Sequence, residues 1–153
     1  MTEQLAVDAV DKAIIGALQV DGRASYAELA GDVGLSAPAV RQRMQRLIDS
    51  GVLQVVAVTD PLKLGLPVMA MVGITVDGDI RAVADEVGTI DAAIYVVITS
   101  GSFDLFVEVV CQDMDELFTV VNDRLKAIDG VRTAESFVYF DIHTHRFTWD
   151  LPA

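Results

Sequence analysis

The stretch from Gly22 to Leu53, GRASYAELAGDVGLSAPAVRQRMQRLIDSGVL, decides how the first third of the chain folds. Ser25-Tyr26-Ala27-Glu28 has the spacing of a capping box, in which the serine oxygen accepts a backbone N–H and the glutamate reaches back. Gly34 suits the left-handed position that ends a helix. Ser36 then caps another helix, with Pro38 in its first turn. We therefore predict two short helices joined by a tight turn.

The residues around this stretch complete a small domain. Residues 8–19 have apolar side chains at helical spacing, and the helix after Ser36 has a second apolar stripe. After Gly51, the β-branched run Val52–Thr59 predicts a short hairpin. We thus predict a winged helix-turn-helix over residues 1–60. The apolar positions of the two stripes are Val10, Ile14, Ala17 and Leu18, then Val40, Met44, Leu47 and Ile48.

From Pro67 onward the hydrophobic period changes from that of helices to that of strands. The predicted order is βαββαβ, a ferredoxin-like arrangement, over residues 61–153, with a connector at about 59–66. The fold class is therefore α+β. The expected strands are Val68–Val76, Ala93–Ser100, Asp104–Cys111 and Val131–Phe140, and the expected helices are Ile80–Val87 and Met114–Ile128.

Two of these strands are apolar on both faces. Ile94, Val96 and Ile98 alternate with Tyr95 and Val97, and residues 105–110 show the same two-sided pattern. Both helices of a βαββαβ unit pack on one face of its sheet, so the other face needs a different cover. An exposed apolar patch of that size promotes aggregation. We therefore predict that a second copy of the chain covers the open face.

The net charge of the whole chain argues against nucleic-acid binding, but the local charge of one segment does not. With 11 basic and 23 acidic residues the net charge is −12, whereas DNA-binding proteins usually present a positive surface. However, residues 36–46 contain three arginines and no acid. Phosphate contacts depend on charge within a Debye length, about 8–10 Å. The acidic composition thus lowers the expected affinity for DNA but does not exclude DNA binding.

The helix after Ser36 has the composition of a DNA-reading helix. A helical wheel places Gln42 and Arg46 opposite the buried stripe, with Ala39 beside them and Arg41 and Arg43 on the flanks. Arginine suits phosphate and guanine contacts, and glutamine suits adenine. The alternative is an ordinary solvated helix face. Arg23, just before the capping box, is either a phosphate contact or a structural ion-pair partner.

The whole pattern resembles the Lrp/AsnC family of bacterial and archaeal transcriptional regulators. The resemblance covers nearly the whole chain, with the two halves in the same order. The matching pieces are Asp11, Gly22-Arg23-x-Ser25, Leu29-Ala30, Val33-Gly34-Leu35-Ser36, Val40-x-x-Arg43, Arg46-Leu47, Gly51-Val52-Leu53, Asp60-Pro61, Leu64-Gly65, Gly101-Ser102-Phe103-Asp104 and Gly130-Val131.

This resemblance implies sequence-specific DNA binding that responds to a small effector, commonly an amino acid, in a homodimer that assembles into tetramers or octamers. Asp104 is expected either to take the amino group of the effector or to brace its loop, and a plain hairpin loop is the alternative for that segment. The expected DNA-binding residues are Arg23, Ser25, Ser36, Ala39, Arg41, Gln42, Arg43 and Arg46. The expected effector residues are Thr99, Ser100, Gly101, Ser102, Phe103, Asp104 and Ser136.

Other classes of function have less support in the sequence. The N-terminus lacks a secretory signal and the longest uncharged run is too short to span a bilayer, so a cytoplasmic protein without membrane contact is expected. No cofactor or metal is expected: His143 and His145 suit a surface or interface pair better than a metal site, and Cys111 suits a buried core. The rivals are a tetrapyrrole decarboxylase-like enzyme on the same scaffold and an amino-acid sensor that does not bind DNA.

Overall fold

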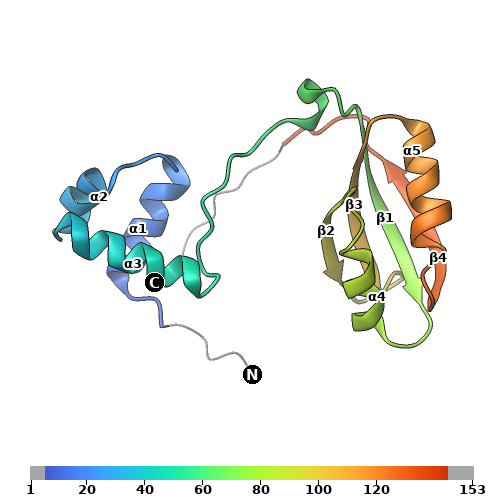
Figure 1. Cartoon of the computed structure of the whole chain (residues 1–153), viewed down its shortest axis with the longest axis horizontal. Helices are drawn as coiled ribbons and strands as arrows, with labels where there is room; N and C mark the ends of the chain where they lie inside the picture. The colour runs from blue at the N-terminus through green and yellow to red at the C-terminus, as the bar shows by residue number, and fades with distance from the viewer. Residues whose placement is uncertain (1–5, 145–153) are drawn as a thin grey trace. The chain divides into compact units, whose positions relative to one another are not determined.

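The computed structural model describes residues 6–144. The chain divides between Val58 and Thr59 into two compact units, and Thr144 is grouped with the first (Figure 1). His145 and Trp149, and hence the predicted histidine pair and the role of the C-terminal tail, lie outside the described residues. No helix among the described residues is long and apolar enough to cross a membrane.

The first unit consists of three helices, α1 (Ala9–Val20), α2 (Tyr26–Val33) and α3 (Ala37–Asp49). Apolar side chains from all three helices, together with Leu53 after α3, form one core. The helical prediction is confirmed, although Ile48 is 41% exposed and lies outside the core. The buried members of this core are Ile14, Ile15, Leu18, Leu29, Ala30, Val40, Met44, Leu47 and Leu53.

The ends of these helices follow from the capping residues. Ser25 and Glu28 form the predicted capping box, and the backbone N–H of Ser25 holds the pKa of the Glu28 carboxyl below its usual value. Gly34 ends α2 at φ 67°, a left-handed conformation that glycine adopts without strain. A second capping box, formed by Asp8 and Asp11, begins α1.

The predicted wing is wrong. Residues 54–60 contain neither helix nor strand. A tight hairpin needs residues such as Asn-Gly or Asp-Gly between its two strands, and the run Val52–Thr59 has none. Val55, Val56 and Val58 are consequently exposed.

The second unit is a four-stranded antiparallel sheet in the order β2-β3-β1-β4, which confirms the predicted ferredoxin-like arrangement. Val72 of β1 pairs with Val107 on one side and Ser136 on the other, which fixes the register. A short 3₁₀ helix, η1 (Pro61–Leu64), precedes the sheet. The strands are β1 (Val68–Val76), β2 (Ala93–Ile98), β3 (Leu105–Cys111) and β4 (Val131–Val138).

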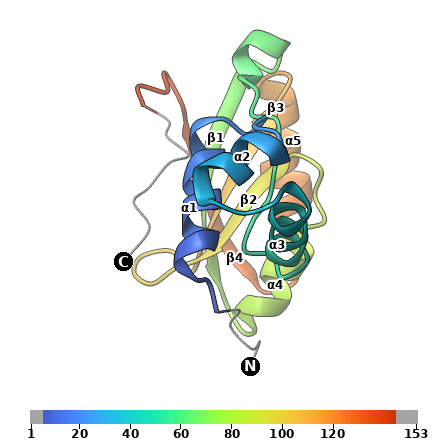
Figure 2. The ribbon, with the colours of Figure 1, turned by 90° about the vertical axis from the view of Figure 1, so that its left-hand side faces the viewer.

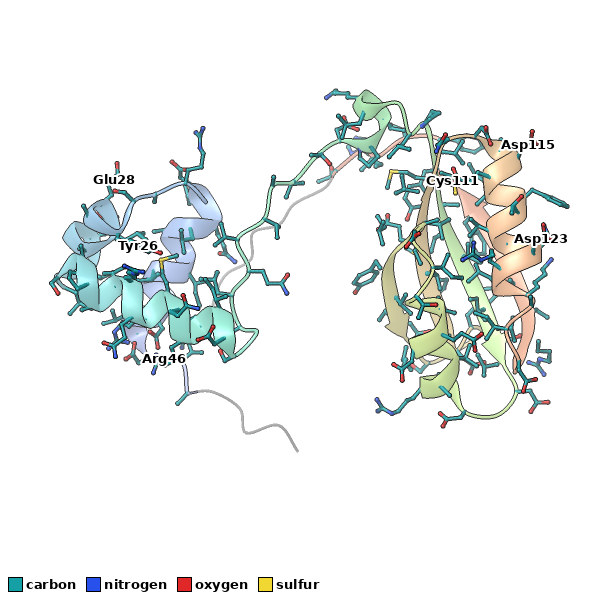
Figure 3. All side chains as sticks on the ribbon, in the orientation of Figure 1. Tyr26, Glu28, Arg46, Cys111, Asp115 and Asp123 are labelled. Carbon is teal, nitrogen blue, oxygen red and sulfur yellow. The ribbon has the colours of Figure 1, made fainter. Side chains whose placement is uncertain are left out.

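Helices α4 (Ile80–Val87) and α5 (Met114–Thr119) lie on the same face of this sheet (Figure 2). Residues of β1 and β3 alternate between this face and the open face, so Ala70, Val72 and Ile74 join the helices in the core. Cys111 is also buried there (Figure 3), and burial raises the pKa of its thiol to about 11. The predicted core role of this cysteine agrees with the structure.

The second long helix differs from its prediction. After α5 the chain continues as a π-helix, η2 (Val120–Leu125), and not as an α-helix to Ile128. The side-chain amide of Asn122 donates a hydrogen bond to the carbonyl of Phe118, four residues earlier. A side chain that occupies this carbonyl competes with the regular helical hydrogen bond. Leu125 and Ile128 remain buried despite the wider turn.

Candidate functional site

The exposed side of α3 is the first candidate site. Arg41 and Gln42 are exposed, and Arg41 forms no hydrogen bond or ion pair with the part of the chain that the structure describes. The side-chain amide of Gln45 donates to Asp49 over 2.7 Å. Together with neighbours on the same helix these residues line one shallow, open concavity. Its lining residues are Pro38, Arg41, Gln42, Gln45, Arg46, Asp49 and Ser50.

The other two arginines of α3 are engaged by α1. Arg43 donates from Nη1 to Asp8 Oδ2 at 2.7 Å and to Asp11 Oδ1 at 2.8 Å. Arg46 donates from Nη2 to Asp11 Oδ2. Asp11 is fully buried, so these two guanidinium groups balance its charge. We refer to Asp8, Asp11, Arg43 and Arg46 as the α1–α3 ion cluster.

Two members of the ion cluster, Asp8 and Arg43, have shifted pKa values. The backbone N–H of Asp11, followed by the guanidinium of Arg43, lowers the pKa of the Asp8 carboxyl. Asp8 and then Asp11 in turn raise the pKa of Arg43. A buried carboxylate is stable only while paired, and breaking such a pair costs about 3–5 kcal/mol. The cluster therefore fastens α3 to α1.

The structure thus divides the predicted DNA-binding residues into groups. Arg41 and Gln42 are exposed, as the helical wheel predicts, and their side chains form no hydrogen bond or ion pair with residues 6–144. Arg46 projects from α3 (Figure 3) but is only 45% exposed, because its end contacts Asp11. Arg43, at 29%, is more strongly enclosed. The wheel misses these contacts because it considers one helix alone.

The remaining predicted DNA-binding residues lie before or at the start of a helix. The oxygens of Ser25 and Ser36 accept the N–H groups of Glu28 and Ala39, so each serine caps its helix. Ala39 is half-buried. Arg23 is 95% exposed and lies 3.7 Å from Asp21, a weak surface ion pair that leaves its donors accessible.

The second candidate site is the loop of residues 99–104 between β2 and β3. Asp104 Oδ2 accepts the backbone N–H of Val76 at 2.8 Å, and the hydroxyl of Thr99 donates to the carbonyl of Phe103 at 2.8 Å. These contacts anchor both ends of the loop. Ser100, Gly101 and Ser102 form its exposed tip, and Gly101 has φ 121°. Of the two roles expected for Asp104, the structure shows the bracing one.

Phe103 folds from this loop onto the open face of the sheet. Its ring contacts Phe106 and Phe137 edge-on, with centroid distances of 5.4 and 6.0 Å. A Cβ atom on Gly73 would lie 2.8 Å from the Phe103 ring, so only glycine leaves room for it. No sequence pattern singles out Gly73, because its role depends on a contact with a distant loop.

The same open face carries a half-buried polar contact. The hydroxyl of Tyr139 donates to Glu108 at 2.9 Å, and burial together with Glu108 raises the pKa of Tyr139 to about 12. Ser136, in contrast, pairs with Val72 and therefore faces the helix side of the sheet. Within one chain the structure does not bring Ser136 together with the loop of residues 99–104.

Comparison with known proteins follows the same two-part division. Residues 7–48 match the AsnC-type helix-turn-helix domain, and residues 69–148 match the Lrp/AsnC ligand binding domain. The chain belongs to the Lrp/AsnC family. It is therefore a DNA-binding transcriptional regulator with a ligand-binding domain and not an enzyme, so the decarboxylase alternative is excluded.

Individual Lrp/AsnC proteins resemble the chain over most of its length. An uncharacterized HTH-type transcriptional regulator of Pyrococcus abyssi is 30% identical over 139 residues, 90% of this chain and 88% of that protein. The Mycobacterium tuberculosis leucine response regulatory protein has a TM-score of 0.83 at 25% identity, covering 90% and 95% of the two chains. A Neisseria meningitidis transcriptional regulator in complex with L-Met has a TM-score of 0.79 at 25% identity, covering 95% and 97%.

Proposed function

We propose that this Lrp/AsnC regulator reads DNA through the exposed side of α3, and that a small effector, an amino acid, bound at the loop of residues 99–104 changes its oligomeric state or DNA affinity. The observation that carries the effector part is the construction of this loop. Its ends are anchored through Thr99 and Asp104, while Ser100–Ser102 remain exposed. An anchored loop with an exposed tip is suited to hold a ligand without unfolding.

The chemistry of the loop tip favours the carboxylate of an amino acid. Gly101 at φ 121° lets the backbone approach a ligand closely, and backbone N–H groups in such turns bind anions. The L-Met complex of the Neisseria relative supports amino acids as the class of effector. Asp104 Oδ2 accepts the N–H of Val76, and the remaining lone pairs of this carboxylate can accept the amino group of the ligand.

The open face of the sheet supports a dimer. It carries the ring cluster of Phe103, Phe106 and Phe137, and Tyr95 beside it is 55% exposed. No helix covers this face in the described residues. A second copy placed on it buries apolar surface, and this burial stabilises the dimer by about 25 cal/mol per Å². We propose a homodimer that assembles further into tetramers or octamers.

The DNA part of the proposal rests on α3. Arg41 and Gln42 contact DNA with their exposed side chains, and Arg46 contributes the donors that Asp11 leaves. Arg23 is available to bind phosphate. Paired helices of a dimer reach successive major grooves when they lie one turn apart, about 34–36 Å. An effector that stabilises one dimer arrangement over another changes this spacing and so the affinity for DNA.

A thermal-shift screen of the full-length protein against the twenty amino acids tests the effector site. We expect at least one to raise Tm, because a saturating ligand stabilises by about 2.7 kcal/mol at a hundredfold excess over Kd. Ser102→Asp places a like charge beside the ligand carboxylate and should abolish the shift. Ala82→Asp adds the same charge on α4, where Ala82 is exposed, and should retain it.

Two results count against this assignment. If the same amino acid shifts both variants as much as the wild type, the pocket lies elsewhere in the chain. If no amino acid shifts the wild-type protein, an effector of this class is contradicted. Asp104→Ala is not a suitable test, because it also removes the contact with the N–H of Val76.

A further inference from the structure

Asp11 is the one charged side chain that is fully buried among residues 6–144. Its Oδ1 accepts Arg43 Nη1 at 2.8 Å, and its Oδ2 accepts Arg46 Nη2 and, at 3.2 Å, the backbone N–H of Asp8. Every contact to this carboxylate is thus a hydrogen-bond donor, and two of the donors are charged. Charge-assisted hydrogen bonds of this kind are short and strong. Asp11 therefore fixes the guanidinium groups of α3 that it contacts.

The two arginines held by Asp11 differ in what they leave accessible. Arg43 is 29% exposed, shares Nη1 between Asp8 and Asp11, and does not line the concavity on α3. Arg46 is 45% exposed and lines that concavity beside Arg41 and Gln42. A guanidinium has five N–H donors, and only Nη2 of Arg46 contacts Asp11. The other donors of Arg46 remain for a ligand on the exposed side of α3.

We propose that Asp11 is a positioning residue for DNA binding: it holds the Arg46 guanidinium at one end so that its other donors meet DNA in a fixed orientation, while Arg43 serves the fold alone. This inference rests on the proposed DNA-reading role of α3. An arginine side chain has many rotamers, and fixing it before binding reduces the entropy lost on contact. The guanidinium is planar and carries its donors in a fixed fork, so one end can bind Asp11 while the other donors bind DNA.

Lysine cannot take over this double role. Its charge sits on one compact ammonium group, so a lysine at position 46 that pairs with Asp11 is withdrawn from DNA. Arg41 provides the matched control, because it lies on the same helix and forms no hydrogen bond or ion pair with a described residue. Arg41→Lys and Arg46→Lys are the same substitution at the same net charge. Only the second one meets a buried carboxylate.

The experiment measures fluorescence anisotropy of a labelled duplex from the region upstream of the protein's own gene. The full-length wild type, Arg41→Lys, Arg46→Lys, Asp11→Asn and the double variant Asp11→Asn/Arg46→Lys are compared at a temperature at which circular dichroism shows each to be folded. A salt titration of each accompanies the affinity measurement, because its slope reports the number of phosphate contacts.

We expect Arg46→Lys to lose about tenfold more affinity than Arg41→Lys. We also expect the salt slope to fall by about one if Arg46 meets phosphate. In the Asp11→Asn background, Arg46→Lys should lower the affinity for DNA by less than about twofold. A merely structural role for Asp11 lowers the urea midpoint but leaves the affinity of the folded protein unchanged.

Equal losses of DNA affinity for Arg41→Lys and Arg46→Lys overturn the inference. So does an Arg46→Lys substitution that lowers the affinity equally with and without Asp11. If Asp11→Asn does not fold, the comparison of the two lysine variants decides alone. A wild type that binds no DNA refutes the proposed function itself, and the inference falls with it. A wild type that binds, with lysine variants that match each other, refutes the inference only.

Discussion

At the scale of single residues, the decisive positions are those whose partners lie far away in the sequence. The sequence identifies Arg41, Gln42, Arg43 and Arg46 as one helical surface, but it does not show which of them Asp11 engages. The capping serines are predictable because capping is local. A contact between α1 and α3 is not local, so the division of the arginines into free and engaged side chains appears only in the folded unit.

Gly73 provides a test of one such distant contact. Its Cβ position lies 2.8 Å from the Phe103 ring, so Gly73→Ala should displace Phe103 and destabilise the protein by about 1–3 kcal/mol. Gly73 does not have a positive φ, so alanine meets no backbone strain there. In a Phe103→Ala background the cost should disappear, since alanine is otherwise favoured over glycine in a strand. Urea denaturation of the four proteins measures this coupling, and an equal cost in both backgrounds refutes the contact.

At the scale of elements, hydrophobic period and capping predict much of the fold. The strand Val68–Val76 and the helix Ile80–Val87 have the predicted bounds. The prediction of a wing is wrong because β-branched residues favour extended backbone without supplying a turn. The π-helix η2 escapes prediction because the contact of Asn122 with Phe118 leaves the apolar spacing of the helix unchanged.

The loop of residues 99–104 lies between these cases. Its position between two strands follows from the Gly101-Ser102 pair and the flanking apolar runs. Its anchoring does not, because Val76 and Gly73 come from β1 and meet the loop only after the sheet has formed. The predicted site is therefore confirmed as a loop and remains a proposal as an effector site.

At the scale of the whole molecule, the open sheet face is the surface through which we propose that copies of the chain associate. Light scattering should give a mass at least twice the 16.5 kDa of one chain. Phe137→Asp puts a charge among the exposed rings and should shift the mass toward 16.5 kDa. Phe118→Asp is the control, because Phe118 is 65% exposed on α5, on the helix side. A wild-type monomer at micromolar concentration contradicts the assembly, and so does an equal effect of both variants.

The net charge of −12 belongs to the same scale. Acidic residues such as Asp115 and Asp123 lie on the second unit (Figure 3), whereas residues 36–46 contain three arginines and no acid. Two of these arginines are partly neutralised by the α1–α3 ion cluster. DNA binding then depends on few phosphate contacts, so we expect a shallow dependence of the affinity on salt concentration.

The most direct measurement of the central claim is the affinity of the full-length protein for its own upstream DNA, with and without the Arg41 side chain. Arg41→Ala should weaken binding by about 1–3 kcal/mol without lowering the urea midpoint, because Arg41 has no partner among the described residues. Arg81→Ala removes the same charge from α4 of the ligand-binding domain and should leave the affinity unchanged. Equal affinities of wild type and Arg41→Ala, or equal losses in both variants, would contradict DNA reading by the exposed side of α3.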